Sequence, residues 1–77
     1  MEVLEHVFQS EALKLALYVP ADRTLYIAFH TGRIYRYDDI PEAVFTGLTE
    51  AQSAGVYFNA VVRHYSYREV ETTSLQR

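Results

Sequence analysis

Aromatic and basic side chains alternate in the segment Gly32-Arg33-Ile34-Tyr35-Arg36-Tyr37, which has the most distinctive spacing in the chain. In an extended strand successive side chains point to opposite faces, so Tyr35 and Tyr37 share one face while Ile34 and Arg36 share the other. Exposed aromatic rings beside basic groups suit single-stranded nucleic acid, because bases stack on rings and cations hold phosphates. The segment therefore indicates a binding surface, without specifying a ligand or a reaction.

Two surfaces are candidates for such binding. One is the outward face of the predicted strands, provided that no terminal segment covers it. The other lies near the end of a predicted helix, where Asn59 and Arg63 stand four residues apart and His64 and Arg68 follow. Arg63 also suits the negative end of a helix dipole, so a purely structural role stays open for it. The candidate nucleic-acid-binding residues are Lys14, Tyr18, Tyr26 and Arg36 on the outward face of the strands and Asn59 and Arg63 on the helix. His30 and Ile34 share the outward face with the first four.

Signatures of catalysis and metal binding do not occur in the sequence. The chain has no cysteine, which excludes disulfides, thiolate nucleophiles and cysteine-based metal sites. His6, His30 and His64 lack metal-ligand spacing, and helix capping explains the adjacent Asp38 and Asp39. Nucleophile elbows, phosphate-binding glycine loops and dinucleotide fingerprints are also missing. We therefore expect a protein that is not an enzyme and that carries no cofactor and no metal.

Length and composition limit the chain to one small domain. Its 77 residues are expected to form a single unit over 1–77, with a core at about 9–70 and a flexible tail at 71–77. Hydrophobic residues make up 49%, and seven tyrosines and four phenylalanines supply the large side chains that a small core needs. The formal charge of -3 disfavours nucleic-acid binding by charge alone. Because neither a signal peptide nor a long apolar run occurs, we expect a cytoplasmic protein with no membrane segment.

Alternation of apolar and polar residues predicts a small antiparallel β-meander. In the first strand the alternation places Leu13, Leu15 and Leu17 on the buried face and Tyr18 on the outward face. Residues 1–9 fit a helix and a strand equally well. The first two expected strands cover residues 12–19 and 24–30, and the third lies in the segment 32–37.

The loop between the second and third strands decides which tyrosines are buried. A two-residue loop would turn Arg36 into the core. A three-residue loop with Gly32 in the left-handed conformation would instead pair Ile27 with Tyr35. We expect the three-residue loop, because it keeps a charged group out of the core and gives the glycine a purpose.

Two helices are expected after the strands. Pro41 suits a first helical position, which predicts a helix over 41–52, and Ser53 can cap a second helix over about 54–64. Gly47 costs about 0.8–1 kcal/mol relative to alanine in a helix interior, which indicates that a neighbour packs closely there. The segment after the second helix allows a short fourth strand at a sheet edge.

The predicted fold is α+β, a three-stranded meander with a possible fourth strand and two helices packed on one face. Tyr35 and Tyr37 are assigned to the core, since they share a face with Leu25 and Ile27. The predicted core comprises Leu13, Leu15, Leu17, Leu25, Ile27, Phe29, Tyr35, Tyr37, Val44, Phe45, Leu48, Phe58, Val61 and Val62.

Several spaced motifs follow one another in this chain between Gln9 and Val70. They are Leu25-x-Ile27-x-Phe29 with Gly32, Tyr35-x-Tyr37, Ile40-Pro41 with Val44-Phe45 and Leu48, and Ala51-x-Ser53-x-Gly55 leading into Tyr57-Phe58-Asn59 and Tyr65. In this order the motifs resemble the KTSC domain. That short family is named after the lysyl-tRNA synthetase C-terminal extension and is also found as stand-alone bacterial and phage proteins.

The resemblance implies a binding module, with RNA suggested by the family's attachment to a tRNA synthetase. Val56 stands where relatives are often basic and Ser66 where proline is frequent, and both departures weaken phosphate binding in this chain. We expect a small non-catalytic module, monomeric or weakly dimeric, that binds RNA or tRNA. The alternative is a protein-interaction module or a homodimer-forming domain that binds no nucleic acid.

Overall fold

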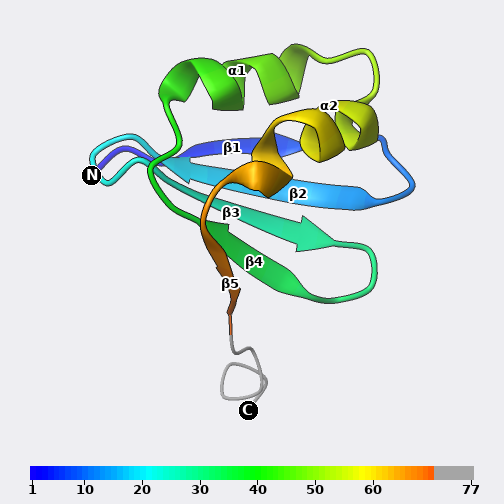
Figure 1. Ribbon diagram of the computed structural model, residues 1–77, viewed down its shortest axis with the longest axis horizontal. Helices are drawn as coiled ribbons and strands as arrows, with labels where there is room; N and C mark the ends of the chain where they lie inside the picture. Colours follow the sequence, from blue (N-terminus) through cyan, green and yellow to red (C-terminus); the bar gives the residue numbers. More distant parts are fainter. Residues whose placement is uncertain (71–77) are drawn as a thin grey trace.

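The computed structural model describes residues 1–70, in which two helices cover one face of a five-stranded antiparallel sheet (Figure 1). The strands lie in chain order across the sheet. The elements are β1 (Leu4–Val7), β2 (Leu13–Val19), β3 (Thr24–Phe29), β4 (Ile34–Tyr37), α1 (Glu42–Glu50), α2 (Ala54–Ala60), the short 3-10 helix η1 (Val62–His64) and β5 (Tyr67–Glu69).

The predicted α+β class is confirmed, and the sheet has one strand at each edge beyond the three-stranded meander. At one edge, β1 is a strand that pairs with β2. Part of the segment 1–9, which fitted a helix and a strand equally well, is therefore a strand. At the other edge, β5 is the short additional strand that the sequence allowed, and it pairs with β4. The predicted flexible tail, 71–77, lies outside the described residues.

The hairpin between β3 and β4 has the predicted register. Ile27 pairs with Tyr35 and Leu25 pairs with Tyr37, and Gly32 has a φ of 95°. Glycine adopts this left-handed region without steric cost, which is why it occupies this position of the loop. The prediction of a three-residue loop is confirmed, and both tyrosines lie on the side of the sheet that the helices cover.

The predicted face of β2 is wrong, because a β-bulge interrupts the pairing of β2 with β3 between Leu13 and Leu15. One extra residue in a strand exchanges its two faces from that point onward. Leu13 is buried under the helices, and beyond the bulge Ala16 takes that side with none of its surface exposed. Leu15 and Leu17 were predicted to lie in the core, but they are half-buried on the outer face of the sheet.

Tyr18 also changes sides and becomes the largest fully buried side chain among the described residues. Its ring stacks on the ring of Phe45 in α1, with centroids 5.1 Å apart and an interplanar angle of 11°. Its hydroxyl donates a hydrogen bond of 2.5 Å to the carbonyl oxygen of Ile40. The prediction that Tyr18 points outward is therefore wrong.

The core lies between the sheet and the two helices. Most of the predicted core residues are there, either buried or packed against the buried cluster; Val61 is only half-buried and lies outside that cluster. The residues buried in the described part of the chain include four that the prediction omitted: Phe8, Ala16, Tyr18 and Ile40.

Both helices are shorter than predicted. Pro41 occupies the N-cap position of α1, without a side-chain capping bond, instead of lying in the first turn. The second helix divides into α2 and η1 near Val61, where two β-branched valines disfavour the α-helix. Ser53 caps α2 as predicted, since its Oγ accepts a hydrogen bond of 3.3 Å from the N–H of Val56.

Gly47 gives Tyr57 room to pack α2 against α1. A Cβ atom built on Gly47 would lie 2.8 Å from Cζ of Tyr57, closer than real Cβ contacts come. The prediction of a close neighbour at this glycine is confirmed. That neighbour is an aromatic ring of the second helix.

Candidate functional site

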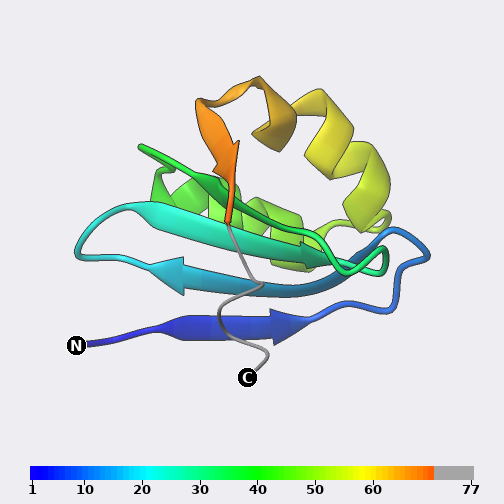
Figure 2. The same ribbon diagram turned by 90° about the horizontal axis from the view of Figure 1, so that it is seen from below.

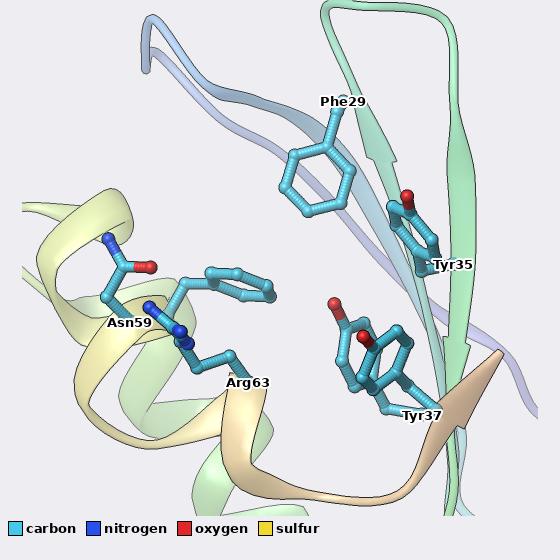
Figure 3. A pocket seen from close by; sticks show the side chains of 7 residues that line it. Phe29, Tyr35, Tyr37, Asn59 and Arg63 are labelled. Atoms are coloured by element: carbon cyan, nitrogen blue, oxygen red, sulfur yellow. The ribbon is translucent and has the colours of Figure 1, made fainter. Parts of the chain in front are cut away.

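An open pocket of about 340 Å³ lies between the helical segment α2–η1 and the strands β3, β4 and β5 (Figure 3). We call it the aromatic pocket. It opens at the side of the sheet that carries the helices. Five of its lining residues are aromatic, and the full set is Phe29, Tyr35, Tyr37, Phe58, Asn59, Arg63 and Tyr67.

The five rings contact one another in a closed circuit. Phe29 meets Tyr35 and Phe58 at centroid distances of 5.7 and 5.4 Å, both edge to face. Tyr37 meets Phe58 at 5.7 Å and Tyr67 at 5.6 Å, and Tyr67 closes the circuit with Tyr35 at 5.8 Å. Each distance falls in the range in which aromatic pairs attract, so the rings hold one another in place and leave the pocket preformed.

Pairing between β4 and β5 positions the tyrosine wall of the pocket. Tyr67 lies opposite Tyr37 in the register, and the alternation along β4 places Tyr35 on the same side. The strand β5 is fixed by a hydrogen bond of 2.7 Å from the N–H of Val70 to the carbonyl of Ile34. An exposed ion pair of 3.1 Å between Arg33 and Glu69 adds a second link between the hairpin and β5.

The polar side of the pocket comes from α2 and η1. Figure 3 shows Asn59 and Arg63 next to each other, with Tyr35 and Tyr37 across the pocket. Both polar side chains are exposed, and within residues 1–70 the guanidinium of Arg63 forms no salt bridge. The pocket therefore combines a cationic group and an amide with a wall of aromatic rings.

The phenol of Tyr37 is a neutral hydrogen-bonding group at physiological pH. Burial, with smaller contributions from the neighbouring hydroxyls of Tyr35 and Tyr67, raises the pKa of Tyr37 to about 12. Only 3% of the surface of Tyr37 is exposed. A group that stays protonated to such high pH can orient a ligand, but it does not exchange protons near neutrality.

The structure separates the six predicted site residues into two groups and two single positions. Asn59 and Arg63 come together at the aromatic pocket, as the patch near the second helix predicted. Tyr26 and Arg36 are paired neighbours on the outer face of the sheet, as predicted, and Arg36 binds Asp38 through an ion pair of 3.0 Å.

The two remaining predicted residues lie apart from both groups. Lys14 is exposed at the bulge of β2, and Tyr18 is in the core, where it cannot contact a ligand. His30 lies exposed after β3 and lines a neighbouring hollow of about 320 Å³ that shares Phe29 and Tyr35 with the aromatic pocket.

Sequence reasoning missed that core residues also form the wall of a pocket. Phe29, Tyr35, Tyr37 and Phe58 were assigned to the core alone, and all four line the pocket. Tyr67 was not selected at all. The alternation of Tyr65 and Tyr67 beside a predicted edge strand was the signal that a further aromatic residue would join the Tyr35-x-Tyr37 side of the sheet.

Two further properties of the described residues bear on function. Among residues 1–70 no group of three or more His, Asp and Glu side chains is placed to hold a metal ion. In the same part of the chain no helix has both the length and the apolar character needed to cross a membrane.

The fold defines this chain as a small α+β domain with an antiparallel sheet and a single helical layer. The family model of the KTSC domain matches residues 9–67. The chain therefore belongs to the KTSC domain family.

The chain is also similar to individual proteins in sequence and in structure. The chain is 37% identical over 65 residues to an uncharacterised protein of Stutzerimonas stutzeri, covering 82% of this chain and 92% of that protein. It is 36% identical over 55 residues to a protein of Tsukamurella paurometabola, covering 71% and 82% of the two chains. The crystal structure of a KTSC domain protein from Yersinia pestis has the same fold, with a TM-score of 0.85 at 24% identity over 91% of this chain and 100% of that chain.

Proposed function

We propose that this KTSC domain is a non-catalytic binding module and that its aromatic pocket binds single-stranded RNA, including unpaired segments of tRNA. The observation that carries the proposal is that five aromatic rings, held in place by one another, line one open pocket together with Arg63 and Asn59. Bases that are not paired stack on aromatic side chains, and arginine holds the adjoining phosphate. The family's attachment to a tRNA synthetase is consistent with this ligand.

The chemistry of the pocket supports binding without catalysis. Its ionisable groups are phenols and one guanidinium, and the pKa of Tyr37 is raised to about 12 by burial. A general acid or base works best with a pKa near the operating pH, which none of these side-chain types has. The size, about 340 Å³, lies at the small end of ligand pockets and suits one base with its sugar phosphate.

Because the net charge is -3, the proposed RNA contact should be confined to the aromatic pocket. Long-range attraction to RNA is weak for such a chain, so affinity must come from stacking and from the single arginine at the pocket. Each base that stacks on an aromatic residue contributes about 1–3 kcal/mol. We therefore expect modest affinity that depends only weakly on salt.

The test is a titration of fluorescently labelled single-stranded RNA and tRNA, followed by anisotropy at two salt concentrations. Arg63→Gln should weaken binding by about tenfold and make the salt dependence shallower by about 0.7 in log–log slope. Tyr67→Ala should weaken binding by about tenfold, with little change in that slope. Arg23→Gln is the matched control, because Arg23 is exposed and does not line the pocket.

Two results would count against the proposal. If wild-type protein binds no RNA even at low salt, the competing hypothesis of a protein-interaction module is favoured. If Arg23→Gln weakens binding as much as Arg63→Gln, the contact is diffuse and the pocket is not the site.

A further inference from the structure

The outer face of the sheet, opposite the helices, is apolar at its centre. Figure 2 views the molecule from below and shows α1 behind the strands. Val7 on β1 is 68% exposed, and the residues that follow it across the sheet in the same register are half-buried and apolar. These residues are Leu15, Ala28 and Ile34.

A second row of paired residues crosses the same face with opposite charges at its two ends. It begins with Glu5 on β1, passes through Leu17, Tyr26 and Arg36, and ends with Arg68 on β5. The guanidinium of Arg36 is paired with Asp38 of the same chain. Among the described residues neither Glu5 nor Arg68 forms a salt bridge. We call this the outer row; it consists of Glu5, Leu17, Tyr26, Arg36 and Arg68.

The two ends of the outer row are complementary to each other in charge. A two-fold axis parallel to the strands and passing over the central strand β3 exchanges the two edges of the sheet. Glu5 of one copy then lies opposite Arg68 of the second copy, and the reverse contact forms at the other edge. Tyr26 lies near the axis, facing the same residue of the second copy, and Arg36, whose charge is already paired with Asp38, lies opposite Leu17.

The neighbouring apolar row fits the same arrangement. The two-fold operation places Leu15 on β2 opposite Ile34 on β4 of the second copy, so apolar side chains face each other across the interface. Sheets packed in this way lie about 10 Å apart, with strands within about 30° of parallel. One symmetry operation therefore brings together the oppositely charged ends of the outer row and the residues of the apolar row.

We propose that the outer face of the sheet is the interface of a homodimer, formed face to face around a two-fold axis over β3. The helices and the aromatic pocket lie on the opposite side of each sheet, so both pockets stay open to solvent in the dimer. The interface is therefore independent of the RNA-binding function proposed above.

The experiment is sedimentation equilibrium over a range of protein concentrations, on the full chain and on charge-reversed variants. Wild-type protein should form a dimer. Glu5→Arg and Arg68→Glu should each weaken dimerisation by at least about tenfold, because each places like charges opposite each other. The double variant Glu5→Arg/Arg68→Glu exchanges the two signs and should restore dimerisation to near the wild-type level.

Matched controls come from the helical layer. Glu42→Arg and Arg63→Glu reverse charges of the same types at exposed positions away from the outer face, and both should leave dimerisation unchanged. Circular dichroism of every variant identifies any loss of fold. A wild-type protein that stays monomeric at all concentrations overturns the proposal, and so does a dimer in which the double variant is no better than the single ones.

Discussion

The hydroxyl of Tyr18 on β2 donates a hydrogen bond of 2.5 Å to the carbonyl oxygen of Ile40, which lies just before α1. Both residues are buried, with 1% and 0% of their surfaces exposed. The bond fixes the segment that leads from the sheet to the helices, and it satisfies a backbone carbonyl that water does not reach.

Removing this hydroxyl should destabilise the domain. Tyr18→Phe keeps the ring stacked on Phe45 but leaves the Ile40 carbonyl without its partner, which costs about 1–3 kcal/mol. Urea denaturation measures the loss. Tyr26→Phe is the control, because no hydrogen bond of the Tyr26 hydroxyl is found in the described residues; it should change the free energy of unfolding by less than about 0.5 kcal/mol.

Gly47→Ala should destabilise the domain although alanine is the better helix former. Alanine would gain about 0.8–1 kcal/mol in helix propensity, but its methyl group would meet the Tyr57 ring at 2.8 Å from Cζ. Overpacking of this kind costs about 1–3 kcal/mol, so we expect a net loss in thermal denaturation. The same substitution in a Tyr57→Ala background removes the clash and should be neutral or stabilising. A gain in stability in the wild-type background would contradict the packing described for α1 and α2.

High pH should destabilise the domain through Tyr37. Its pKa is raised from 10.0 to about 12 in the folded state, mainly by burial. The folded state thus holds the proton more tightly than the unfolded state. Its contribution to stability is complete below about pH 10 and is lost as the pH rises toward about 12.

Spectroscopic titration of tyrosinate absorbance tests this assignment. Burial raises the pKa of Tyr18 as well as that of Tyr37, so the wild-type protein should show late-ionising tyrosines, and Tyr37→Phe should reduce the amplitude of this late step. Tyr35→Phe serves as the comparison and should leave that late step in place. An unchanged titration curve in Tyr37→Phe would show that another tyrosine is responsible.

The N-cap of α2 should make a measurable contribution to stability. Ser53→Ala removes the Oγ that accepts a hydrogen bond of 3.3 Å from the Val56 N–H, at an expected cost of about 1 kcal/mol. Ser53→Asp retains an acceptor and should keep most of the stability. Chemical denaturation of the two variants, side by side, decides whether the side-chain cap or another property of the position matters.

Local patterns in the sequence predicted the β3–β4 hairpin correctly, because one requirement, that a charged side chain stay out of the core, decides its register. Keeping Arg36 out of the core required a loop in which Gly32 is left-handed, and the structure has that loop. The same logic failed for β2, since Leu15 and Leu17 on one face and Tyr18 on the other are all hydrophobic enough to be buried. Alternation alone could not show that a bulge exchanges the two faces.

The aromatic pocket could not be predicted from local sequence patterns, for a different reason. Asn59 and Arg63 were paired correctly from their helical spacing, but their aromatic partners come from β3, β4 and β5. The pairing of β5 with β4, in which Tyr67 lies opposite Tyr37, brings the end of the described chain to that wall. Such a long-range contact leaves no periodic signal in the sequence.

The position of β5 has a consequence for the order in which the molecule folds. Each of β1 to β4 pairs with the strand just before or after it in the chain, whereas pairing β5 with β4 closes a loop that contains both helices. Closing the longer loop costs more chain entropy, so we expect β5 to dock after the hairpins have formed. In native-state hydrogen exchange the Val70 amide, which bonds to Ile34 of β4, should open more readily than the amides of β2 and β3. The tyrosine wall would then be the last part of the domain to assemble, so that incompletely folded chains would lack the aromatic pocket.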